Sequence, residues 1–285
     1  MGIRMMWCWA IALLALFPAL AADNTKPPLP PTTVPDLRTT DAAIMSVESD
    51  APFDGATHKL VLDGLVNNTY FAELRNALYL QDSAYQFSSK AHFDNCDFDA
   101  SIAYLEQLLA EAGKHVDTAL TSRKSKDEPG AIAAAKKAFF ALGRALHGVQ
   151  DFYAHTNYVE LAKADVKRVT DIAVVAPWRD KGKALIQELL PKGLVSGYVF
   201  WGFPQRCPGG ALSHGALAKD SESTTAGKIK VPHLNNITQY KIAVTLAREA
   251  SRELMRDAFE RWPILSELNG PNIALEAFVD RRGLK

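Results

Sequence analysis

The sequence has little cysteine and no excess of charge of either sign. Cys8 lies in the first residues, so Cys96 and Cys207 are the only cysteines in the rest of the 285-residue chain. Lysine plus arginine equals aspartate plus glutamate, at 32 each, so net charge draws the chain to neither a polyanion nor a membrane surface. No basic run interleaves with aromatic residues, which counts against a module that binds nucleic acid without catalysis.

Long uninterrupted apolar runs are also missing, except at the start of the chain. Residues 1–21 combine Arg4 with about fifteen apolar residues and a small-x-small triplet that ends at Ala21. This pattern predicts a signal peptide cleaved near Ala21, and therefore export to the periplasm or the extracellular space. No later segment approaches the length of a transmembrane helix, so we expect no integral membrane segment in the mature chain.

Export would place Cys96 and Cys207 in an oxidising compartment. A single disulfide between them is then reasonable, and two small buried thiols are the alternative. The sequence leaves both possibilities open.

The chain is expected to divide into three parts: the signal peptide, a tail and one domain. Residues 22–51 hold five prolines between Pro27 and Pro35, which disfavours helix and predicts an extended tail. Residues 52–285 are predicted to form a single all-α, multi-helix domain. Apolar residues recur there every three to four positions, with predicted helices over 69–87, 99–123, 130–163, 180–190 and 234–262. Ser125 or Asp127 is expected to cap the third of these helices, with Pro129 in its first turn.

Two features of this domain stand apart from the helical pattern. Residues 194–232 are rich in glycine, proline and serine and form the one long irregular segment, which in a compact domain usually carries function. No alternation of apolar and polar residues is sustained enough to predict a sheet. Within the irregular segment, Tyr198, Phe200, Trp201 and Phe203 either contact a lipid or a base or, more commonly for such residues, belong to the core.

The most informative residues are the histidines. His147, Asp151 and His155 are spaced four apart, so at 100 degrees per residue they share one face of the predicted helix. A single histidine on an apolar face is usually a hydrogen-bonded core residue. Three titratable groups on one stripe favour a metal ion instead, because a buried carboxylate is usually tolerated only beside a metal cation or an imidazolium partner.

Other segments carry the same residue types. His92 and Asp94 follow a helix that contains Asp82, His214 and Asp220 lie in the irregular segment, and His58 lies near the first helix. Imidazoles and carboxylates drawn from distant segments are the ligands that zinc selects. We therefore expect a divalent metal site, most consistent with zinc, while His115 and His233 are expected to be a solvated residue and a helix-cap residue.

Three segments also carry a resemblance to a known family. The stretches "LGRALHGVQDFYAHTNYVEL", "HFDNC" and "SGYVFWGFPQRCPGGALSHGALAKD" resemble the Het-C family of heterokaryon incompatibility proteins in its bacterial form. That family is distantly similar to the zinc-dependent phospholipases C and the single-strand-specific nucleases. The resemblance implies an all-helical phospholipase C-like fold with two or three zinc ions over residues 55–262.

The resemblance also implies roles for individual residues. His147, Asp151 and His155 match the central metal-binding motif, Asp82 and His92 look like its upstream partners, and His214 looks like a later ligand. Asp94 could replace Asp82 as the carboxylate ligand, and Asp220 is the carboxylate nearest after His214. Asp82 would then orient the attacking water as a general base.

Two hypotheses follow for the function. In the first, the protein is a secreted metal-dependent phosphoesterase, phospholipase C-like or nuclease-like, that acts on phospholipid or nucleic acid. In the second, the same residues bind one structural ion in a non-catalytic module for incompatibility, toxicity or partner binding. Whether the protein is an enzyme is left open.

Overall fold

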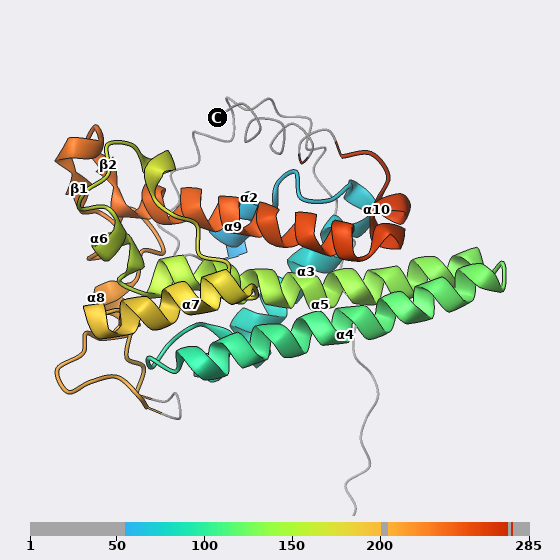
Figure 1. Cartoon of the computed structure of the whole chain (residues 1–285), viewed down its shortest axis with the longest axis horizontal. Helices are drawn as coiled ribbons and strands as arrows, with labels where there is room; N and C mark the ends of the chain where they lie inside the picture. The colour runs from blue at the N-terminus through green and yellow to red at the C-terminus, as the bar shows by residue number, and fades with distance from the viewer. Residues whose placement is uncertain (1–54, 201–204, 273–274, 276–285) are drawn as a thin grey trace, which may run out of the picture. The chain divides into compact units, whose positions relative to one another are not determined.

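The computed structural model describes residues 55–200, 205–272 and 275, and this part of the chain is mostly helical (Figure 1). The predicted all-α class is confirmed at this level. The predicted signal peptide and proline-rich tail lie outside the described residues, and so do Trp201 and Phe203. Among the helices that are described, none has the length and apolar character needed to cross a membrane.

Four helices form the body of the domain: α3 (Asn68–Ala84), α4 (Phe98–Lys124), α5 (Glu128–His155) and α9 (Gln239–Arg261). Helix α5 packs against α3, α4 and α9, so it lies at the centre (Figure 1). Its sequence allows this position because the small side chains of alanine and glycine let neighbouring helices pack closely. At Gly143 a β-carbon would come within 2.7 Å of Ala77 Cβ on α3.

The start of α5 agrees with one of the two predicted caps. Asp127 is the N-cap residue, and its side chain accepts a hydrogen bond from the backbone amide of Gly130 at 3.0 Å. Pro129 occupies the first turn, where a missing amide proton costs nothing. The cap fixes a tight connection between α4 and α5, which run side by side (Figure 1).

Shorter elements surround these four helices. The α-helices are α2 (Gly55–Leu62), α6 (Tyr158–Ala162), α7 (Asp180–Leu189), α8 (His214–Leu217) and α10 (Pro263–Asn269). The 3-10 helices are η1 (Ser89–Ala91), η2 (Val169–Asp171), η3 (Leu190–Lys192) and η4 (Pro232–Leu234). The strands β1 (Lys230–Val231) and β2 (Ile237–Thr238) pair antiparallel, with Lys230 opposite Thr238.

The structure corrects two helix boundaries. The helix predicted over 130–163 ends at His155, because Thr156 is extended and its backbone pairs with Ser196. The helix predicted over 234–262 begins only at Gln239, because Asn235 and Asn236 adopt positive φ angles of 59° and 56°. No sheet was expected, but the structure contains one pair of two-residue strands. These strands are too short to produce an alternating pattern in the sequence.

The irregular segment is confirmed as mainly irregular, with α8, η4 and β1 as short interruptions. It is joined to the start of α4 by a disulfide between Cys96 and Cys207, whose Cα atoms are 4.8 Å apart. The disulfide is thus the correct one of the two possibilities. Tyr198 and Phe200 are 41% and 72% exposed, so the core interpretation is wrong for these two residues. Val199 between them is buried, because side chains alternate along an extended segment.

Candidate metal centre

The stripe predicted on α5 lies in the last two turns of that helix. His147, Asp151 and His155 are all buried. His147 Nε2 lies 2.8 Å from Asp151 Oδ2, and His155 Nδ1 lies 4.0 Å from the same oxygen. Asp151 is therefore placed between the two imidazoles, as the four-residue spacing predicted.

A first group of ligand atoms lies where α2 meets α5. It consists of His58, His147 and Asp151, whose ligand atoms are all within 4.8 Å of one another. His58 Nε2 is 3.4 Å from Asp151 Oδ1, while its Nδ1 lies 2.6 Å from the amide oxygen of Gln150. Gln150 Oε1 can only accept, so it holds a proton on His58 Nδ1, while Nε2 faces the Asp151 carboxylate.

A second group shares His147 and adds residues from α3 and from the turn after η1. His147 Nε2 lies 3.1 Å from His92 Nδ1 and 3.5 Å from Asp82 Oδ1. His92 Nε2 is 3.2 Å from the carbonyl oxygen of Tyr85, and its Nδ1 lies 2.9 Å from Asp151 Oδ2, a contact that an ion bound to both atoms would replace. The side chain of Asp82 is 37% exposed, so this group opens toward solvent.

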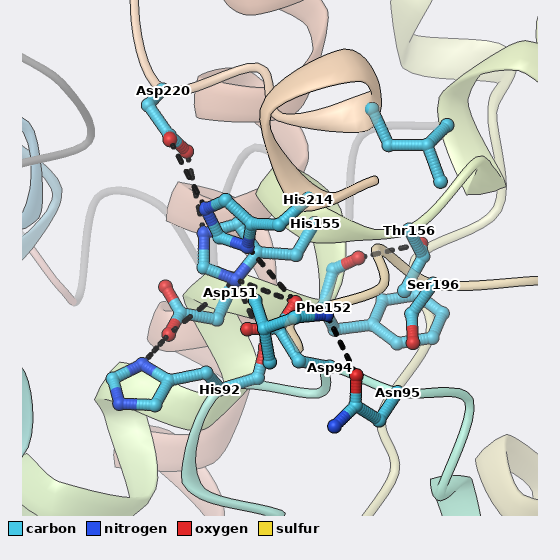
Figure 2. A network of polar contacts seen from close by, with 12 residues as sticks. His92, Asp94, Asn95, Asp151, Phe152, His155, Thr156, Ser196, His214 and Asp220 are labelled. Atoms are coloured by element: carbon cyan, nitrogen blue, oxygen red, sulfur yellow. Dashed lines mark hydrogen bonds and ion pairs between the residues drawn. The ribbon is translucent and has the colours of Figure 1, made fainter. Parts of the chain in front are cut away.

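A third group lies at the end of α5 and comprises Asp94, His155 and His214 (Figure 2). Asp94 Oδ1 is 3.0 Å from His214 Nδ1 and 3.9 Å from His155 Nδ1. Asp220 faces the same two histidines, 3.3 Å from His155 Nε2 and 3.8 Å from His214 Nε2. The side chain of His214 is 30% exposed, so this group too is accessible from one side.

The structure thus brings together every residue that the sequence suggested for the site. The set comprises Asp82 and the eight predicted ligands His58, His92, Asp94, His147, Asp151, His155, His214 and Asp220. The two excluded histidines lie outside these groups. His115 is on α4, and His233 Nε2 contacts the carbonyl oxygen of Lys163 at 2.8 Å.

The turn that carries His92 and Asp94 has an unusual backbone. Phe93, Asn95 and Cys96 have positive φ angles of 54°, 59° and 55°, a region that non-glycine residues rarely adopt. Such conformations cost free energy and persist only where surrounding contacts impose them. The positions of His92 and Asp94 are therefore imposed by contacts from outside this turn.

The charges of the cluster favour a cation. Burial would raise the pKa of Asp151, but His147 and His155 outweigh burial and hold this pKa well below its usual range. Burial would lower the pKa of His155, but Asp151, Asp94 and Asp220 outweigh it and raise this pKa well above the usual value. At His147 burial prevails and lowers the pKa, so this imidazole is favoured in the neutral form that binds metals.

Two carboxylate oxygens of the cluster are left without hydrogen bonds. Asp151 Oδ1 and Asp220 Oδ1 are buried and have no hydrogen-bond partner among the described residues. Each oxygen faces an imidazole nitrogen, His58 Nε2 at 3.4 Å and His155 Nε2 at 3.3 Å, and a bound divalent ion would satisfy the oxygen and the nitrogen together. The donor set and these two oxygens therefore fit a metal ion.

Two residues that support the candidate ligands, Gln150 and Lys219, were not predicted from the sequence. Gln150 lies on α5 beside the ligand stripe, and a glutamine within such an apolar helix was a usable signal. Lys219 is fully buried, and its ammonium group donates to the carbonyl oxygens of Thr156 and Leu217 at 2.8 and 2.9 Å. It anchors the segment that carries His214 and Asp220, and nothing in the sequence around it pointed to this role.

Part of this region is similar to a described protein family. Residues 68–173 match the family model of the VWA7 N-terminal domain. The match runs from α3 to η2 and includes Asp82, His92, Asp94 and the whole α5 stripe. It covers less than half of the chain, so it is a similarity of this part. No curated protein and no solved structure matches the chain significantly.

This match corrects the family assignment made from the sequence. The resemblance to Het-C is wrong, because two of the three stretches quoted for it lie inside the part that matches the VWA7 N-terminal domain. The phospholipase C-like and hydrolase assignments drawn from that resemblance lose their support with it. The reason is physical: a His-x3-Asp-x3-His stripe specifies ligand geometry on a helix, and unrelated helices can present the same geometry.

Proposed function

We propose that the protein binds two or three divalent metal ions in the cluster at the C-terminal end of α5. The observation that carries this proposal is the placement of three ligand groups around one helix, two of which share His147. Zinc fits best, because the donors are imidazole nitrogens and carboxylate oxygens. Gln150 and Tyr85, which fix the protonation of His58 and His92, supply the outer contacts that such ligands require.

Phosphoester cleavage by this centre, on phospholipid or nucleic acid, stays a prediction. Neighbouring divalent ions supply Lewis acidity and a nucleophile derived from water at neutral pH. Asp82 is the partly exposed carboxylate beside His92 and His147, so it is placed to accept a proton from water. His214, at the accessible edge of the third group, is placed to contact the leaving oxygen. This support is chemical, because the matching family model names no reaction.

A non-catalytic metal-stabilised interaction module is the second candidate. The ligands come from α2, α3, the turn after η1, α5 and the segment around α8. An ion bound among them would cross-link segments that are distant in the sequence and so stabilise the fold. Under both candidates the protein is exported, which the Cys96–Cys207 disulfide supports because such bonds persist in oxidising compartments.

Metal stoichiometry combined with thermal melting separates the two candidates. We expect purified protein loaded with zinc to hold two or three ions per chain by inductively coupled plasma mass spectrometry. His147→Ala removes a ligand from two groups and should lose at least one ion, whereas His115→Ala is the matched control and should lose none. If the His147→Ala and wild-type proteins hold the same number of ions, the proposed centre is wrong.

The same preparations test the reaction. Two or more ions whose removal leaves the melting temperature nearly unchanged would favour chemistry, and one ion that the fold requires would favour the structural module. Loaded protein is then incubated with phosphatidylcholine vesicles and, separately, with single-stranded DNA. The phosphoesterase prediction requires release of a soluble phosphate ester from one of them, abolished by chelation. A fully loaded protein that is inert on both would contradict it.

A further inference from the structure

One extended segment connects the three parts of the chain that supply the third ligand group. The Gly197 amide donates to the carbonyl oxygen of His155 at 2.9 Å, and the Gly197 carbonyl accepts from the amide of Asn95 at 2.8 Å. The His214 amide donates to the Tyr198 carbonyl at 2.8 Å. Residues 195–199 therefore set the relative positions of Asp94, His155 and His214, the last of which is the ligand most distant along the chain.

The disulfide links the turn that carries Asp94 to the irregular segment that carries His214. Cys96, two residues after Asp94, is bonded to Cys207, and its amide donates to Ser196 Oγ at 2.8 Å. Asn95 lies between Asp94 and Cys96 in the sequence and is fully buried. Its side-chain oxygen accepts from the Val199 amide at 2.8 Å, and its carbonyl accepts from the Arg206 amide at 2.9 Å (Figure 2).

The first ligand group is held differently. His58 lies on α2, and His147 and Asp151 lie on α5; α2 packs against α3 and α9, which both pack against α5. In the second group, Asp82 and His147 lie on the packed helices α3 and α5, and only His92 adjoins the turn that carries Asp94. Asp94, by contrast, lies in the strained turn between Phe93 and Cys96, whose positive φ angles depend on outside contacts. Cutting the disulfide removes a covalent contact of this turn and leaves the helix packing in place.

We propose that the Cys96–Cys207 disulfide controls metal occupancy of the group formed by Asp94, His155 and His214. The oxidised protein fills this group, and reduction weakens its ion while the ions held by His58, His147 and Asp151 remain. The inference rests on the proposed metal binding and adds its regulation. We expect an affinity loss of about 10- to 100-fold at the third group, the usual effect of losing an outer contact of a metal ligand.

The chemical step is a two-electron reduction. A phosphine reductant attacks one sulfur, the S–S bond breaks, and water supplies the oxygen of the phosphine oxide and the two thiol protons. Cys96 and Cys207 become thiols, and the phosphine is oxidised. In a cell a dithiol would serve instead, becoming a disulfide as the protein disulfide opens.

The test counts zinc ions per full-length chain before and after reduction with a phosphine. A Cys96→Ser, Cys207→Ser double variant accompanies it, because free thiols could bind zinc themselves. We expect both the reduced protein and the double variant to hold one ion fewer than the oxidised protein at zinc concentrations that just saturate the oxidised form. His214→Ala should already lack this ion and lose none on reduction, whereas His58→Ala should lose a further one.

Each other outcome overturns the proposal. Equal ion counts and equal zinc affinities in the two redox states would show that the disulfide does not act on the site. Loss of helical circular dichroism on reduction would show that the disulfide holds the whole fold. An oxidised protein that binds no zinc would instead refute the proposed function itself, so the two failures are distinguishable.

A second variant examines the same turn with the disulfide intact. Asn95→Ala removes the side-chain contact to Val199 and should weaken zinc binding by about 10-fold at the third group only. Gln205, which also contacts Asn95 Oδ1, offers the milder change Gln205→Ala as a control, because Gln205 is exposed. If Asn95→Ala leaves zinc affinity unchanged, this turn does not position Asp94, and the proposal fails.

Discussion

Gly197 lies so close to the backbone of His214 that no other residue fits there. A β-carbon at this position would come within 2.5 Å of His214 Cα, and within 3.1 Å of its backbone nitrogen. The neighbouring atoms belong to the main chain, so they cannot move aside as a flexible side chain would. A single methyl group would therefore push the His214 segment away from Asp94 and His155.

Gly197→Ala is expected to weaken zinc binding at the third group by about 10-fold or more, and to lower the free energy of unfolding by about 1–3 kcal/mol. Gly209→Ala is the matched control, because a β-carbon there meets no atom within 4 Å. Zinc titration calorimetry and urea unfolding measure the two effects. Similar behaviour of the two variants would contradict the close approach.

The clustering of the candidate ligand residues on α5 could be predicted from the sequence, whereas the contacts that position the others could not. The spacing of His147, Asp151 and His155 is local, and helix periodicity translates it directly into a shared face. The approach of His214 to Asp94 joins residues 120 positions apart. This approach depends on the close contact between the backbones of Gly197 and His214. A glycine alone does not predict such a contact, because glycine also occurs in turns and helix caps.

Helices α3 and α5 carry ligands on facing surfaces, so their separation determines the second ligand group. Asp82 lies on α3 and His147 on α5, and their ligand atoms are 3.5 Å apart. Four residues before His147, Gly143 lets the two helices approach. A β-carbon there would come within 2.9 Å of Leu74 Cα and 3.0 Å of Leu74 O.

Gly143→Ala should lower the free energy of unfolding by about 1–3 kcal/mol, because it forces α3 and α5 apart. Gly113→Ala is the comparable change on α4, where a β-carbon would meet only the Trp262 ring at 3.4 Å. Alanine favours helix over glycine by up to about 1 kcal/mol, so this variant should be neutral or more stable. Chemical unfolding of both proteins provides the measurement, and equal destabilisation would count against the explanation.

The existence of the long helices could be predicted more reliably than their ends. Apolar periodicity continues past His155 into α6, so no local pattern indicated the break at Thr156. That break arises because the Thr156 backbone pairs with Ser196, and Thr156 Oγ1 donates to the Phe152 carbonyl at 2.6 Å. A contact between segments 40 positions apart thus overrides a local preference, and it places His155 at a helix end.

The molecule as a whole is also held together far from the metal centre. Trp178 and Arg179, just before α7, donate hydrogen bonds to Asp257 on α9 at 2.8 and 2.6 Å. Burial would raise the pKa of Asp257, but the hydrogen bonds from Arg179 and Trp178 outweigh burial and lower this pKa below its usual value. A carboxyl group of this kind stabilises the fold above its unfolded pKa of about 3.9 and loses that contribution as the pH falls.

Asp257→Asn is therefore expected to lower the free energy of unfolding by about 1–2 kcal/mol at pH 7. The difference from the wild type should shrink as the pH falls below about 4, because protonation then removes the same charge from the wild type. Urea unfolding across this pH range tests the expectation. Asp180→Asn, at a fully exposed side chain, should change stability little at any pH, and a constant effect of Asp257→Asn would contradict the pKa argument.

The position of the centre at the end of α5 has a consequence for the order of binding. The backbone carbonyls of a helix C-terminus carry about half a negative charge, and those of Ala154 and His155 at the end of α5 accept hydrogen bonds from the amides of Lys219 and Gly197. Four carboxylates, on Asp82, Asp94, Asp151 and Asp220, add to this negative potential. In the metal-free cluster these charges also raise the pKa of His155 well above its usual value and so hold a proton on it. We expect a divalent ion to displace this proton first, and an anionic ligand such as a phosphate ester to bind after the ions have offset the remaining negative charge.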